Sequence, residues 1–223
     1  MNHHRYFSRA SRPVETVVVG AGGFGRSFLA QSLRVPLMNA RVAVDVSATA
    51  AAEGLAAAGI DRAAIRECAS VAEAKRAWDA GHHVAAGDLA LVLDLPVDVV
   101  VEATGHPEAG ARHAALAVEA DKHVALVSKE VDSVVGPGLA HAAAARGRVV
   151  TPVDGDQPSL LIGLVTWAEV LGFEIVAAGK SSEYDFVFDA SAGTLTSNGR
   201  TVPAHDFAAT LELGSRDARE FVA

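Results

Sequence analysis

One short segment near the N-terminus limits the fold of this chain more than any other. Residues 17–19 are three consecutive valines, and Gly20, Gly22 and Gly25 follow them with the spacing G-x-G-x-x-G. Apolar residues then recur at helical spacing over residues 24–33. The pattern predicts a buried strand, a tight turn and a helix in direct succession.

Each glycine of this motif has a physical role in binding a dinucleotide. Gly20 permits the sharp turn, Gly22 lets the backbone approach a pyrophosphate, and Gly25 lets the helix pack closely on the strand. The pyrophosphate would lie at the helix N-terminus, where free N–H groups and the helix dipole favour an anion. Arg26 either contacts the pyrophosphate or lies in solvent, and the sequence leaves both open.

An acidic residue ends the next predicted strand. Residues 41–45 read as a second parallel strand, and Asp45 follows Gly25 at about the spacing of 20 residues expected for a ribose-binding carboxylate. A carboxylate there accepts hydrogen bonds from the ribose hydroxyls and repels a 2′-phosphate. Asp45 therefore favours NAD over NADP, although either cofactor remains open. The alternative is a polar residue at a strand end without a ligand.

Composition narrows the classes of function. The net charge of −8 over 223 residues argues against nucleic acid or an anionic membrane as the main partner. No apolar run is long enough to span a bilayer. The single cysteine, Cys68, fits a reducing compartment, so we expect a cytoplasmic protein. Cys68 lies in an alanine-rich stretch that reads as helical, and we interpret it as a packing residue rather than a nucleophile.

Strand and helix patterns alternate from residue 15 to residue 151. Further strands are predicted at residues 97–103, 123–128 and 148–151, and helices at residues 47–59, 70–78, 107–120 and 137–146. His82 and His83 read as adjacent loop residues, and no spacing indicates a metal site. This alternation predicts an α/β fold with a Rossmann-type doubly wound parallel sheet.

Ligands of such sheets bind beyond the carboxyl ends of the strands. Thr104, Gly105 and His106 follow the strand at 97–103, so we expect them beside the nicotinamide ribose. His106 reads as a residue at the start of a helix, with a catalytic role as the alternative. Lys129 and Glu130 follow the strand at 123–128 and reach the same edge.

We expect three parts along the chain. Residues 1–13 form a disordered basic leader, residues 14–154 the NAD(P)-binding Rossmann domain, and residues 155–223 part of an α+β substrate domain. The last part is expected to contain a helix at 158–171, a strand at 173–178, a turn at 193–199 and an amphipathic helix over 200–223.

One lysine in this last part of the chain lies close in sequence to serines and carboxylates that could take part in catalysis. Asp154 and Asp156 precede the helix at 158–171, and Lys180 lies between a glycine and a pair of serines, with Glu183 close behind. A lysine in that setting can polarise a carbonyl or hold a phosphate. A solvated loop lysine is the alternative.

Several motifs together resemble a known group. Residues 20–26, 100–105 and 122–130 resemble the homoserine dehydrogenase superfamily. Residues 134–138 (Val-Val-Gly-Pro-Gly), 154–158 (Asp-Gly-Asp-Gln-Pro) and 177–180 (Ala-Ala-Gly-Lys) are similar to the deoxyxylulose-phosphate-reductoisomerase-like oxidoreductases, which share that architecture. The similarity covers roughly residues 14–185. Relatives continue for a second stretch of comparable length, so we expect a truncated form or a partner that completes the substrate domain.

The resemblance implies an NAD(P)-dependent oxidoreductase that transfers hydride between a nicotinamide cofactor and a small, polar, sugar-phosphate-like carbonyl compound. It places Lys129 and Glu130 by the nicotinamide and makes Lys180 the catalytic candidate, with Asp156 and Glu183 nearby. Here Ser-Ser-Glu-Tyr follows Lys180, where family members have a Gly-Thr-Lys-Tyr type of continuation, so the substrate stays open. One alternative is a homoserine dehydrogenase, and another is a nicotinamide-binding module without catalysis.

The expected active site consists of a cofactor-binding set and a catalytic set of residues. The cofactor set is Gly20, Gly22, Gly23, Phe24, Gly25, Arg26, Asp45, Thr104, Gly105, Lys129 and Glu130. The catalytic set is Lys180, Asp156 and Glu183. We expect a small-molecule substrate, no nucleic-acid or membrane partner, no metal, and association into a homo-oligomer.

Overall fold

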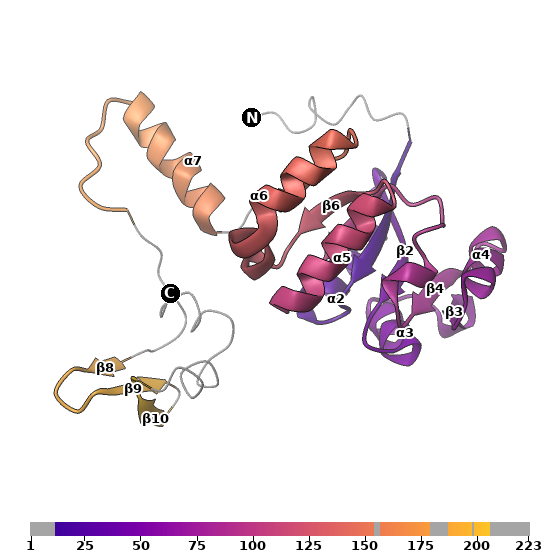
Figure 1. Ribbon diagram of the computed structural model, residues 1–223, viewed down its shortest axis with the longest axis horizontal. Coiled ribbons are helices and arrows are strands. Elements are labelled where there is room, and N and C mark those ends of the chain that lie inside the picture. Colours follow the sequence, from indigo (N-terminus) through magenta and orange to yellow (C-terminus); the bar gives the residue numbers. More distant parts are fainter. Residues whose placement is uncertain (1–11, 154–156, 179–186, 198, 206–223) are drawn as a thin grey trace. The chain divides into compact units, whose positions relative to one another are not determined.

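A computed structural model describes residues 12–153, 157–178, 187–197 and 199–205 of the chain. The chain forms two compact units, Met1–Val153 and Asp154–Ala223. Figure 1 shows the elements of both units.

The first unit is built on a seven-stranded, wholly parallel sheet with the strand order β3-β4-β2-β1-β5-β6-β7. The strands are β1 (Val14–Val19), β2 (Met38–Val44), β3 (Ile65–Cys68), β4 (His83–Ala86), β5 (Val99–Glu102), β6 (His123–Leu126) and β7 (Val150–Pro152). The chain proceeds outward from β1 on one side and returns to β5 on the other. The strand order therefore reverses between β1 and β5, which is the topological switch point of a doubly wound sheet. The predicted Rossmann-type fold is confirmed.

Helices cover both faces of this sheet (Figure 1). They are α2 (Gly23–Ser32), α3 (Ala48–Ala57), α4 (Val71–Asp79), α5 (Pro107–Glu119) and α6 (Lys129–Ala145), with 3₁₀ turns at Arg62–Ala64 and Leu89–Leu91. Residues of α2 and α3 share one apolar core, and residues of α4, α5 and α6 share the other. Because side chains alternate across a strand, Val18 packs into the first core while Val17 and Val19 pack into the second.

Three local predictions in this unit are wrong. Cys68 ends strand β3 rather than lying in a helix, and His83 begins strand β4 rather than lying in a loop. Both strands have only four residues, and their alanines, arginine and glutamate have weak strand propensity, so sheet pairing decides their conformation. Helix α6 begins at Lys129 and contains Pro137, whereas the sequence predicted its start at Pro137.

The early start of α6 has a tertiary cause. Val131 is buried, and Val135 packs against the core formed with α4 and α5. Proline removes one hydrogen bond from a helix interior and crowds the preceding turn. The burial of this apolar stretch offsets that loss.

The second unit contains α7 (Gln157–Val170) and a three-stranded antiparallel sheet. The strands are β8 (Val187–Asp189), β9 (Thr194–Ser197) and β10 (Arg200–Pro203) in the order β10-β9-β8. The predicted helix at 158–171 agrees with α7. The predicted strand at 173–178 is wrong, because those residues form no strand.

The predictions for residues 193–203 are also wrong. Most of the expected turn at 193–199 is strand β9, and residues 200–203 form strand β10 instead of a helix. Gly193 and Gly199 have positive φ angles and bracket β9, whose threonines favour a strand. The rest of the expected helix, residues 206–223, lies outside the described residues.

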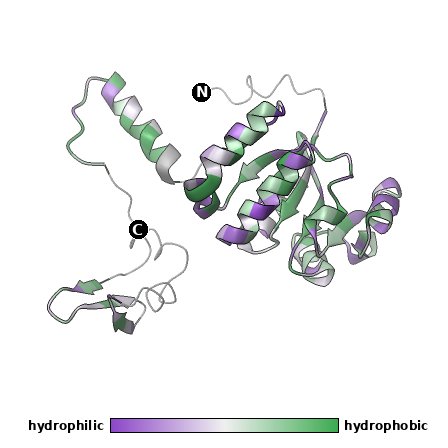
Figure 2. Cartoon of the chain, in the orientation of Figure 1, coloured by the Kyte–Doolittle hydropathy of each residue, from purple (hydrophilic) through white to green (hydrophobic). Residues whose placement is uncertain are grey.

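Most residues of helix α7 are apolar, and Figure 2 shows green along much of its length. Its exposed large side chains are Leu160, Ile162, Leu164, Trp167 and Val170. Helices with this composition are normally covered by other protein.

Across the described ranges, no helix combines the length and the apolar character needed to cross a membrane.

Candidate functional site

The glycine motif forms a tight turn between β1 and α2. Gly20 has a φ of +93°, and a Cβ atom there would lie 2.7 Å from the carbonyl oxygen of Ala103. A Cβ atom at Gly25 would lie 2.0 Å from the carbonyl oxygen of Gly20. Apart from neighbouring residues of the chain and the backbone of α2 itself, no atom of the described residues lies within 4 Å of the position that a Cβ atom would take at Gly22 or Gly23. Packing therefore requires glycine at 20 and 25, whereas Gly22 and Gly23, which lie between them, face open space.

The N-terminus of α2 is available to an anion. Gly22 is its N-cap and makes no side-chain cap, and the first turn holds no acidic residue. The guanidinium of Arg26 is exposed and its Nε donates to the carbonyl of Gly22 at 3.3 Å, while Phe24 stacks on Phe28. The residues present fit a pyrophosphate at this position, because its backbone approach is open and its free N–H groups are unshielded.

Asp45 lies directly after β2 and contacts the glycine turn. Its Oδ2 accepts a hydrogen bond from the backbone N–H of Ala21 at 2.7 Å, and its Oδ1 accepts one from Val46 at 2.7 Å. Each carboxylate oxygen has a further lone pair. The contact with Ala21 was not predicted, because the two residues lie in separate loops.

The carboxyl end of β5 meets the same turn. A Cβ atom at Gly20 would lie 2.8 Å from the backbone nitrogen of Thr104, so the two segments are in direct contact. The N–H of Gly105 donates to the hydroxyl of Ser128 at 2.8 Å. His106 is the exposed N-cap of α5 and makes no side-chain cap.

Lys129 and Glu130 form the first turn of α6, directly after Ser128. Both carboxylate oxygens of Glu130 are buried, and neither has a hydrogen-bond partner among the described residues. The contacts from Asp45 to Ala21, from Gly20 to Thr104 and from Gly105 to Ser128 thus join the predicted cofactor residues along one edge of the sheet.

The predicted catalytic residues Lys180, Asp156 and Glu183 lie outside the described residues. Within the described part of the chain, no three His, Cys, Asp or Glu side chains come together as a metal site requires.

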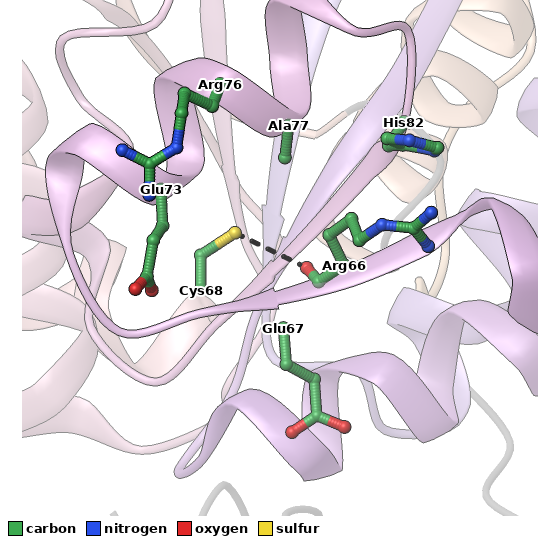
Figure 3. A pocket seen from close by; sticks show the side chains of 7 residues that line it. All are labelled: Arg66, Glu67, Cys68, Glu73, Arg76, Ala77 and His82. Atoms are coloured by element: carbon green, nitrogen blue, oxygen red, sulfur yellow. Dashed lines mark hydrogen bonds between the residues drawn. The ribbon is translucent and has the colours of Figure 1, made fainter.

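A shallow groove of about 250 Å³ lies elsewhere, between β3 and α4 (Figure 3). It is lined by Arg66, Glu67, Cys68, Glu73, Arg76, Ala77 and His82. Burial, and then the charge of Glu73, raise the pKa of the Cys68 thiol, which donates weakly to the carbonyl of Arg66. The thiol therefore stays protonated at neutral pH. None of the residues predicted to bind a cofactor or substrate lines this groove.

The fold and the contiguous edge around the glycine turn define a Rossmann-type α/β domain. No protein-family model and no curated protein matches the chain. The solved structures that it resembles include homoserine dehydrogenases, the protein yvaA from Bacillus subtilis and an NAD-binding protein from Listeria innocua.

Three of these structures illustrate the likeness. The WlbA dehydrogenase from Bordetella pertussis, in complex with NADH and UDP-GlcNAcA, is 16% identical, with a TM-score of 0.49, over 73% of this chain and 41% of that one. A homoserine dehydrogenase from Thiobacillus denitrificans is 22% identical, with a TM-score of 0.46, over 63% and 29%. GenD2 from gentamicin A biosynthesis, in complex with NAD, is 20% identical, with a TM-score of 0.45, over 65% and 35%. The chain spans less than half the length of each.

Proposed function

We propose that the first unit binds a pyridine dinucleotide and that the chain is an NAD(P)-dependent oxidoreductase. One observation carries this proposal. Gly22 and Gly23 open onto free space at the uncapped N-terminus of α2, between two glycines that packing requires. A backbone of this kind suits the pyrophosphate of a dinucleotide.

The residues expected to contact the adenosine ribose, Asp45 and Val46, support binding of NAD rather than NADP. The carboxylate of Asp45 lies beside the glycine turn, where it would accept hydrogen bonds from ribose hydroxyls and repel a 2′-phosphate. The next residue, Val46, is 92% exposed and carries no positive charge. A 2′-phosphate would therefore lack a cation from this segment.

At the other end of the cofactor, Thr104, Gly105, Lys129 and Glu130 would surround the nicotinamide. The buried oxygens of Glu130 support this proposal, because buried carboxylate oxygens are normally hydrogen-bonded. A bound nicotinamide supplies or accepts the hydride. The protein would hold the substrate carbonyl beside it and exclude water.

The substrate chemistry rests on the sequence motifs. Lys180 would stabilise the negative charge that develops on the carbonyl oxygen, and Asp156 and Glu183 would orient the substrate. We propose a small, polar, sugar-phosphate-like carbonyl compound as the substrate. Homoserine and aspartate semialdehyde are the second candidate pair, suggested by the motifs shared with homoserine dehydrogenases.

Residues 155–223 would supply part of a substrate domain, and the protein would act in the cytoplasm as a homo-oligomer. The exposed apolar side chains of α7 support association, because a helix of this kind is normally covered. Light scattering on the purified chain measures its mass, and a monomer at micromolar concentration would contradict the oligomer.

Titration with NADH and NADPH, followed by turnover of a carbonyl panel, tests the main proposal. We expect saturable binding, tighter for NADH, and oxidation of NADH with a polar aldehyde or ketone. Turnover restricted to homoserine or aspartate semialdehyde would select the second candidate. Binding of a coenzyme without turnover of any carbonyl compound would indicate a nicotinamide-binding module without catalysis. A folded protein that binds neither coenzyme would refute the proposal.

A further inference from the structure

Side-chain oxygens accept hydrogen bonds from the backbone of the turn formed by residues 104–106. Three consecutive backbone N–H groups donate to them: Thr104 to Oε1 of Glu102 at 3.0 Å, Gly105 to the hydroxyl of Ser128 at 2.8 Å, and His106 to the hydroxyl of Thr104 at 3.2 Å. The Thr104 hydroxyl itself donates to Oε1 of Glu102. The conformation of the turn therefore depends on two acceptors, Glu102 and Ser128.

Both acceptors are fully buried, with 0% of each residue exposed. Oε2 of Glu102 is buried and has no hydrogen-bond partner among the described residues. Burying a carboxyl group is costly unless its hydrogen bonds compensate, and an apolar side chain would suit this position in the core better. The hydrogen bonds to the turn offset part of this cost.

The adjacent helix leaves room for this carboxyl group. A Cβ atom at Gly110 of α5 would lie 2.9 Å from Oε2 of Glu102 and 2.5 Å from Cγ2 of Val131. A glycine at this point lets α5 pack over the carboxyl group without a clash.

The turn lies at the point where a bound dinucleotide would cross the sheet. It contacts Gly20 at the end of β1, and β1 and β5 flank the topological switch point. Building on the proposed function, we infer that Glu102 and Ser128 are positioning residues, which set the turn against which the nicotinamide half of the cofactor binds. They act through the backbone of residues 104–106 rather than by touching the cofactor.

Two ligands separate this role from a general contribution to stability. NADH reaches both halves of the site, whereas ADP carries the adenosine and the pyrophosphate but lacks the nicotinamide riboside. Glu102→Met keeps the length of the side chain without an acceptor, and Glu102→Gln keeps an acceptor oxygen. Thr16→Val is the matched control, because Thr16 is also buried but lies near the amino end of β1.

Calorimetric titration at a temperature where circular dichroism shows each variant to be folded measures both affinities. We expect Glu102→Met and Ser128→Ala to weaken NADH binding about tenfold or more, as the loss of one acceptor for a buried N–H predicts, while ADP binding changes by less than about threefold. Glu102→Gln and Thr16→Val should retain the wild-type ratio of the two affinities.

An equal loss of NADH and ADP affinity in Glu102→Met would overturn the inference, because a merely structural role would act on both halves. Unchanged NADH binding in both Glu102→Met and Ser128→Ala would also overturn it. If the wild-type protein binds neither ligand, the proposed function fails and this inference fails with it. If the wild-type protein binds both ligands, the variants test the role of Glu102 and Ser128 independently of the proposed function.

Discussion

The carboxylate of Asp45 accepts a hydrogen bond from the backbone N–H of Ala21, with 2.7 Å between Oδ2 and the nitrogen. Ala21 lies between Gly20 and Gly22, so the residue predicted to bind the ribose also holds the glycine turn. The turn is packed from α3 as well, because a Cβ atom at Gly54 would lie 2.3 Å from that of Ala21. Substitutions at Asp45 should therefore affect the pyrophosphate site and the ribose site together.

Replacement of Asp45 separates these two effects. Asp45→Asn keeps an acceptor for the Ala21 N–H but removes the charge, so the preference for NADH over NADPH should shrink while the turn persists. Asp45→Ala also removes the acceptor, and NADH affinity should fall about tenfold or more. Titration of both variants with both coenzymes measures this. An equal loss for NADH and NADPH in both variants would mean that Asp45 does not distinguish the ribose.

Substitution of Gly25 should mainly lower stability, whereas substitution of Gly22 should mainly weaken dinucleotide binding. At Gly25 an added Cβ atom meets the Gly20 carbonyl at 2.0 Å, so Gly25→Ala should lower the free energy of unfolding by about 1–3 kcal/mol or more. At Gly22 the space is open, and Gly22→Ala should cost about 1 kcal/mol or less. Gly22→Ala should nevertheless weaken dinucleotide binding, because its methyl group would point into the cofactor site. Urea unfolding and NADH titration give the two measurements. Normal NADH binding by Gly22→Ala would contradict the proposed pyrophosphate position.

Two helical glycines form a second matched pair. Gly110→Ala in α5 should destabilise the fold by about 1–3 kcal/mol, because the added methyl group would press against Val131 and the carboxyl group of Glu102. Gly138→Ala in α6 has open space and should stabilise the fold by up to about 1 kcal/mol through helix propensity. Urea unfolding compares both variants with the wild type. Equal effects of the same sign would argue against the packing of α5 over Glu102.

Asp98 should make stability depend on acidic pH. Its side chain receives two hydrogen bonds from the Arg12 guanidinium, at 2.7 and 2.8 Å, and these hold the pKa of the Asp98 carboxyl at about 2, below its ordinary value. A carboxyl group whose pKa is lower in the folded state stabilises the fold above its unfolded pKa of about 4. That contribution is lost as the pH falls from about 4 towards 2, because the unfolded chain takes up the proton first.

Asp98→Asn should therefore lower stability near neutral pH and flatten the pH dependence between about 4 and 2. The effect should be small and should weaken further in high salt, because the pair is exposed. Urea unfolding over this pH range measures it, with Asp79→Asn as an exposed control in α4. A pH profile identical to that of the wild type would show that the ion pair does not form in solution.

Local sequence patterns were sufficient to predict most strands and helices of the first unit. The valines before Gly20, the capping serines at 47 and 70, and Pro107 in the first turn of α5 each act within a few residues, so the strands and helices around them could be predicted. The order of the sequence elements also placed Gly20, Asp45, Thr104 and Ser128 at the same edge, because parallel strands end together.

Contacts between distant residues could not be predicted in this way. Strands β3 and β4 exist because they pair with each other and β4 also pairs with β2, and α6 begins before Pro137 because Val131 is buried. Glu102 is the charged residue of the otherwise apolar run 99–103, and that charge is the signal that could have indicated a buried acceptor.

The sequence by itself determined the Rossmann-type alternation and the position of the glycine turn, because hydrophobic periodicity and glycine spacing act over short distances along the chain. Only the tertiary structure decided which side chains hold that turn and the one beside it. Asp45 and Ser128 accept hydrogen bonds from backbone N–H groups of distant segments, and Glu102, which accepts one from Thr104 two residues along the chain, is fully buried by the packing around it. Such contacts depend on the packing of the sheet and helices, which no local pattern contains.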